Sequence, residues 1–206
     1  MVDQFLAQWG AAETATESSI FFVRGDPGYR QWKRCSQKVG PGVWAKGFLH
    51  IATPELSDVN DALSSWGFAI GDDDPTRQVL LRNGYGDVVY VQTQGPDITA
   101  RVLSPRRTQV SYPDLRPDVA AVMNFYIGGP TDRIPGRPKE HPFLDRDLFD
   151  AYVAKHGPLG MNEALVPNVP YSLGGKHELA NFHVEDLAAF YRDTGAVWAK
   201  AFGAAS

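Results

Sequence analysis

Apolar residues recur at helical spacing in several segments of the chain. The clearest stripe runs from Leu56 to Trp66: it follows a capping sequence that begins at Thr53, and Gly67 is predicted to close the helix. The same spacing predicts further helices over residues 3–11, 26–40, 114–127, 145–156, 183–193 and 196–202.

A second set of segments is rich in β-branched and aromatic residues, which favour strands. The strands predicted on this basis occupy residues 43–51, 78–83, 87–92, 98–103 and 108–112. Residues 83–86 read Asn-Gly-Tyr-Gly, a glycine-rich connection typical of hairpins. The last four strands therefore predict an antiparallel meander.

A stretch without apolar periodicity divides the chain into two parts. Residues 128–142 contain four prolines, three glycines and almost no apolar residues, which is typical of a linker. The predicted domains are therefore residues 1–127 and 143–206. The expected fold class is α+β, with an antiparallel β-meander and flanking helices in the N-terminal part and a mostly helical C-terminal part.

Composition narrows the class of protein. The chain has 206 residues, enough to bury a core without disulfides, and its single cysteine, Cys35, favours a reducing compartment. No secretory leader or membrane-spanning run is recognised, so we expect a cytoplasmic protein without a membrane partner. A net charge of −4 argues against direct binding of nucleic acid.

Charge is unevenly distributed along the chain. Residues 24–46 contain six bases and one acid, whereas residues 55–74 contain six acids and no base. Either both stretches are solvated surfaces, or the acidic stretch meets a basic partner, since complementary charge accelerates association. The acidic residues in question are Glu55, Asp58, Asp61, Asp72, Asp73 and Asp74.

No pattern typical of a catalytic or metal site stands out. Residues 72–74 lack the spacing of a calcium loop, and the five histidines lack zinc-site spacing. Cys35 lies on an apolar helical stripe, where a core thiol is favoured over a nucleophile. We therefore expect no cofactor and no enzyme activity. Two alternatives stay open: a small hydrolase that combines Asp87, Glu163 and a histidine between the two parts, and a generic scaffold domain.

Several short motifs resemble a known family. In the C-terminal part they are Leu148-Phe149-Asp150-Ala151, His156-Gly157-Pro158-Leu159, Asn162-Glu163 and Leu173-Gly174-Gly175. This part resembles the C-terminal domain of immunity proteins that bacteria pair with DNase effectors of the type VI secretion system. Residues 82–90 are similar to a hairpin of the same proteins, and residues 48–66 resemble their GAD-related N-terminal domain.

The resemblance implies a function. A member of this family would be an immunity protein, or antitoxin, that binds and inhibits a cognate nuclease toxin, one copy of each protein per complex, and so protects the producing cell. The six acidic residues between positions 55 and 74 are then the candidate toxin-binding residues, because a DNA-cleaving domain exposes a basic groove.

Overall fold

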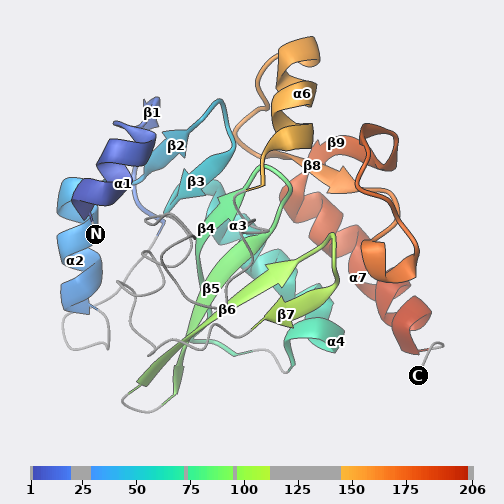
Figure 1. Ribbon diagram of the computed structural model, residues 1–206. Helices are drawn as coiled ribbons and strands as arrows, with labels where there is room; N and C mark the ends of the chain where they lie inside the picture. The colour runs from blue at the N-terminus through green and yellow to red at the C-terminus, as the bar shows by residue number, and fades with distance from the viewer. Residues whose placement is uncertain (1, 20–28, 72–73, 95–96, 112–144, 204–206) are drawn as a thin grey trace, which may run out of the picture.

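The computed structural model describes residues 2–19, 29–71, 74–94, 97–111 and 145–203. Its centre is an antiparallel sheet of seven strands that follow one another in chain order (Figure 1). The strands are β1 (Thr14–Ala15), β2 (Gly42–Trp44), β3 (Leu49–Ile51), β4 (Gln78–Asn83), β5 (Val88–Gln94), β6 (Asp97–Ser104) and β7 (Gln109–Ser111). The predicted meander is confirmed.

Helices flank the sheet, and the C-terminal part adds a small hairpin. The N-terminal helices are α1 (Val2–Trp9), α2 (Tyr29–Lys38), α3 (Glu55–Ala62), the 3-10 turn η1 (Leu63–Trp66) and α4 (Gly67–Ile70). The C-terminal elements are α6 (Asp147–His156), β8 (Glu163–Pro167), the 3-10 turns η3 (Tyr171–Leu173) and η4 (Leu179–Asn181), β9 (Phe182–Asp186) and α7 (Leu187–Gly203). The α+β class, with more helix than strand after residue 143, is confirmed.

Four predicted elements were wrong in detail. Residues 43–51 form a hairpin, because Ala45, Lys46 and Gly47 all have positive φ and reverse the chain. The helix predicted to end at Gly67 changes to a 3-10 turn after Ala62 and resumes as α4, in which Gly67 is the first residue. Residues 182–186, predicted as helix from 183, pair with β8 as a strand, and α7 then continues through Gly195 without a stop.

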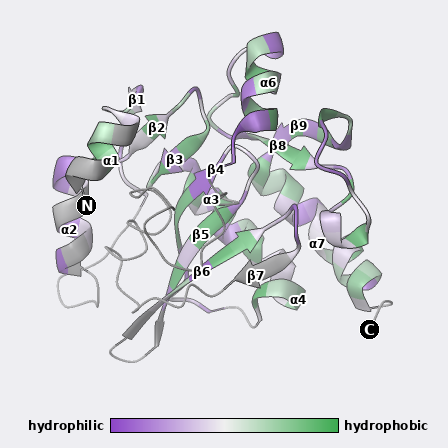
Figure 2. Ribbon diagram, in the orientation of Figure 1, coloured by the Kyte–Doolittle hydropathy of each residue, from purple (hydrophilic) through white to green (hydrophobic). Residues whose placement is uncertain are grey.

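Both faces of the sheet are buried, each under its own core. Along β5, Val89 and Val91 belong to one core while Val88 and Tyr90 belong to the other, because successive side chains of a strand point to opposite faces. The hydrophobic colour accordingly runs along the central strands in Figure 2. The first core lies under α1, α2 and α6, and the second lies under α3, η1 and α7.

The glycine-rich turn between β4 and β5 joins the C-terminal part to the sheet. The backbone N–H of Leu165 donates to the carbonyl of Gly84 at 2.8 Å, and the Tyr191 hydroxyl donates to the carbonyl of Gly86 at 2.8 Å. A Cβ on Gly84 would lie 2.3 Å from the ring of Phe149, so only glycine allows α6 to pack this closely. Both cores therefore contain residues from both predicted parts.

Some predicted features lie outside the described residues. They are the N-cap at residues 26–27, the acidic residues 72 and 73, the helix over 114–127 and the linker over 128–142. Across the ranges described, no helix combines the length and the apolar character that are needed to cross a bilayer.

Candidate functional site

The structure separates the six predicted acidic residues. Asp58 and Asp61 lie exposed on α3, where a spacing of three residues places them on neighbouring positions of one face. Asp74 accepts hydrogen bonds from the backbone and hydroxyl of Thr76, which makes it a turn residue. Glu55 begins α3 and is only 7% exposed, while residues 72 and 73 are among those not described. Their role in toxin binding stays a prediction.

Glu55 belongs to a buried polar network between the sheet and α3. Its Oε1 lies 2.6 Å from Nδ1 of His50 and accepts a hydrogen bond of 2.6 Å from the Thr53 hydroxyl. Nε of Arg82 lies 3.7 Å from the same oxygen. His50 and Arg82 face each other across β3 and β4, so the register of this strand pair assembles the network. The second oxygen, Oε2, is buried and has no hydrogen-bond partner among the described residues.

The charges of this network follow from burial and neighbouring groups. Burial lowers the pKa of His50 to about 4, and the positive charge of Arg82 acts in the same direction. Burial alone would raise the pKa of Glu55, but the hydrogen bond from His50, the charge of Arg82 and the Thr53 hydroxyl together hold it below its ordinary value. Burial lowers the pKa of Arg82 to about 10. At neutral pH the network therefore contains a carboxylate, a guanidinium and a neutral imidazole.

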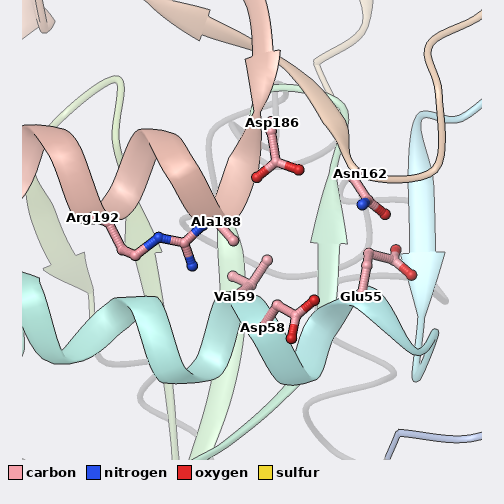
Figure 3. A pocket seen from close by; sticks show the side chains of 7 residues that line it. All are labelled: Glu55, Asp58, Val59, Asn162, Asp186, Ala188 and Arg192. Atoms are coloured by element: carbon pink, nitrogen blue, oxygen red, sulfur yellow. The ribbon is translucent and has the colours of Figure 1, made fainter.

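A small pocket opens beside Glu55, between α3 and the start of α7 (Figure 3). Its volume is about 80 Å³, and Val59 and Ala188 supply apolar walls. Its polar lining is Glu55, Asp58, Asn162, Asp186 and Arg192. Figure 3 shows the carboxylates of Asp58 and Asp186 and the guanidinium of Arg192 pointing toward the space between the two helices.

Three of these polar residues were not predicted as site residues. The β8–β9 pairing places Asn162, just before β8, at the same end of the hairpin as Asp186, the last residue of β9. Asp186 also accepts a hydrogen bond of 2.8 Å from the N–H of Ala189 and so caps α7. An aspartate directly before the apolar run at 187–191 is a helix-start signal, and this signal could have identified Asp186 as the residue at the start of α7. Asn162 belongs to the Asn162-Glu163 motif of the family resemblance, although it was not predicted as a site residue, and nothing local in the sequence indicates Arg192.

The groups of the alternative hydrolase hypothesis occupy different environments. Asp87 is 2% exposed, and its carboxylate is engaged by Arg106, by the Ser104 hydroxyl and by the Asn83 amide. The carboxylate of Glu163 is exposed and accepts a hydrogen bond of 2.7 Å from the Gly160 N–H, the loop-stabilising role that its position favours. Neither Asp87 nor Glu163 lines the pocket beside α3.

The fold defines the structural class of the protein. It is an α+β protein with an antiparallel meander buried on both faces, followed by a C-terminal hairpin and helix. No protein-family model matches the sequence, and the comparison with curated proteins also gave no match. The chain is similar to a solved structure, that of Atu4351 from Agrobacterium tumefaciens, with a TM-score of 0.59 and 15% identity over 95% of this chain and 88% of that chain. At this identity the likeness shows a shared fold and carries no activity or partner with it.

Proposed function

We propose that this protein is an immunity protein that binds a cognate DNase effector of the type VI secretion system and blocks its access to DNA. It acts by occupying a protein surface and not by catalysis, with one copy of each protein in the complex. The family resemblance of residues 82–90 and 148–175 supplies the class of partner. The acidic surface around α3 supplies a physical mechanism.

The observation that carries the proposal is an acidic surface to which both parts of the chain contribute. Asp58 and Asp61 of α3 are exposed, and Asp186 at the end of β9 faces the same pocket as Asp58. A domain that cleaves DNA needs a positively charged groove to neutralise phosphates. Carboxylates on a rigid scaffold can compete for that groove and steer the encounter between the two proteins.

Exposed apolar side chains would strengthen such a complex. Charge alone sets the rate and specificity of association more than its affinity, which needs desolvated apolar contacts. Among the described residues, several large hydrophobic side chains of the C-terminal part are exposed, and Met161 is adjacent in sequence to Asn162 of the pocket. These exposed residues are Met161, Val169, Leu173, Leu179 and Val197.

The direct test is a DNA-cleavage assay. Co-purification first shows whether the protein associates with the product of the adjacent gene, and this product is then assayed for DNA cleavage with and without the protein. We expect stoichiometric loss of cleavage. A nuclease that stays fully active with this protein in excess contradicts the proposal, and turnover of a small compound by this protein alone would favour the hydrolase instead.

A charge-reversal variant tests the acidic surface separately. Asp58→Lys combined with Asp61→Lys should slow association with the nuclease by about 10-fold or more at low salt, because steering by complementary charge is lost. The control with the same change of charge is Asp147→Lys combined with Asp150→Lys, two exposed aspartates that are three residues apart on α6. Stopped-flow association rates at several salt concentrations measure the effect. Equal rates for both variants would remove the α3 surface from the mechanism.

A further inference from the structure

A second pocket lies at the point where strand β3 leaves the sheet. The ladder between β3 and β4 ends at the pair Ile51 and Leu81, and the N–H of Ala52 then donates to the carbonyl of Leu80 at 2.9 Å. Ala52 has a positive φ of 52°, which turns the chain away from β4 toward α3. Residues 78–79 of β4 therefore extend past the end of β3 and leave a notch beside α3.

The pocket in this notch, the notch pocket, has a volume of about 240 Å³. A cavity of about 150 Å³ holds a benzene molecule, whereas sites for drug-sized ligands begin at roughly 300 Å³. The notch pocket therefore has room for one small ring with a few polar substituents. The described residues that line it are Ser19, Leu56, Ser57, Asn60, Gln78 and Val79.

Three of the lining residues have a side-chain oxygen that is buried and has no hydrogen-bond partner among the described residues. These oxygens are Oγ of Ser19, Oδ1 of Asn60 and Oε1 of Gln78. A buried polar atom without a partner is costly, because it loses its hydration and gains nothing in return. Three such atoms around one cavity point to an occupant that donates hydrogen bonds.

The remaining lining determines the charge of the occupant. None of the described residues that line the notch pocket has an ionisable side chain. A charged occupant would lose hydration without gaining a counter-charge, so a neutral molecule is favoured. Leu56 of α3 and Val79 of β4 supply apolar walls, which suit the faces of a ring.

We propose that the notch pocket binds a neutral, single-ring heterocycle with N–H donors, the chemical class to which the pyrimidine bases belong. The side-chain oxygens of Ser19, Asn60 and Gln78 accept hydrogen bonds from its ring N–H or amino groups. The amide nitrogens of asparagine and glutamine can donate to ring acceptors, as they do when these side chains read the edge of a base. This inference goes beyond the proposed function and does not depend on it.

The first test titrates uracil and cytosine into the isotope-labelled protein and follows backbone amide shifts by NMR. We expect saturable shifts at residues 56–60 and 78–79, with a Kd of about 1 mM or lower. The control ligand is uracil methylated at both ring nitrogens, which keeps the ring but has no N–H donor. It should bind at least about 10-fold more weakly, because the buried oxygens stay without a partner. Absence of saturable shifts with both bases, or equal affinity for the methylated ring, overturns the proposal.

The second test removes the two amide groups at similar side-chain size. Asn60→Leu and Gln78→Met, singly and together, should raise the Kd for uracil, by at least about 10-fold in the double variant. The Tm of the free double variant should equal or exceed that of the wild-type protein, because buried oxygens without a partner have been removed. This combination of weaker binding and undiminished stability distinguishes a ligand site from a structural role.

Gln92→Met is the matched control for these variants. Oε1 of Gln92 is also buried and has no partner among the described residues, but Gln92 does not line the notch pocket. Its substitution should change the Kd for uracil by less than about 2-fold. An unchanged Kd in the double variant overturns the proposed location of the site. A double variant that melts well below the wild-type protein shows that the two amides stabilise the fold, and this result also overturns the proposal.

Discussion

Gly195 allows the last helix to pack directly against the backbone of η1. A Cβ at this position would lie 2.2 Å from the carbonyl oxygen of Ser65, 2.7 Å from its Cβ and 2.8 Å from its carbonyl carbon. All three distances are shorter than van der Waals contact, and two of the atoms belong to the backbone. The substitution Gly195→Ala therefore forces α7 and η1 apart instead of displacing a flexible side chain.

Two opposing terms set the size of the effect. Overpacking of a filled interior costs about 1–3 kcal/mol, and contact with fixed backbone places this site at the upper end. Alanine is favoured over glycine inside a helix by about 1 kcal/mol, which offsets part of the cost. The expected net loss is about 2 kcal/mol of unfolding free energy, which lowers Tm by roughly 4–8 °C for a chain of this length.

The assay is urea denaturation followed by tryptophan fluorescence, with thermal melts in parallel. Gly67→Ala is the control, because Gly67 has a helical φ of −49° and a Cβ there would meet no atom within 4 Å. We expect the control to be unchanged or stabilised by up to about 1 kcal/mol. If Gly195→Ala is as stable as Gly67→Ala, the close packing of α7 on η1 is not the native arrangement.

Two further predictions concern buried charge. Because the unfolded chain takes up a proton on His50 near pH 6.5 and the folded protein only near pH 4, stability should be full above pH 6.5 and fall by about 3 kcal/mol as the pH drops to 4. His50→Gln should flatten this slope in urea titrations, and an unchanged slope would contradict the assignment. Asp87→Asn leaves Arg106 buried without its counter-charge and should cost about 3–5 kcal/mol. Asp150→Asn, which removes the exposed ion pair of Asp150 with Arg146, should lower the free energy of unfolding by less than about 0.5 kcal/mol. Equal losses for the two variants would refute the distinction between the buried and the exposed ion pair.

Local pattern predicted most of the secondary structure. The strands β4 to β7 lie close to where β-branched and aromatic runs placed them, because short strands separated by turn residues need no distant information. The prediction was wrong at residues 183–186, where the apolar spacing suits either a helix or a strand. These residues form a strand because they pair with β8, and a window of four residues does not include that partner.

The sequence by itself determined that α3 is acidic, that the chain has an α+β meander and that turn 83–86 is glycine-rich. Tertiary structure decided that Glu55 is buried while Asp58 and Asp61 are exposed, although all three belong to one acidic run. It also brought Asp186 to the same pocket as Asp58, from more than a hundred residues away. The physical reason is that charge and periodicity are local properties of a chain, whereas burial and convergence depend on which surfaces pack together.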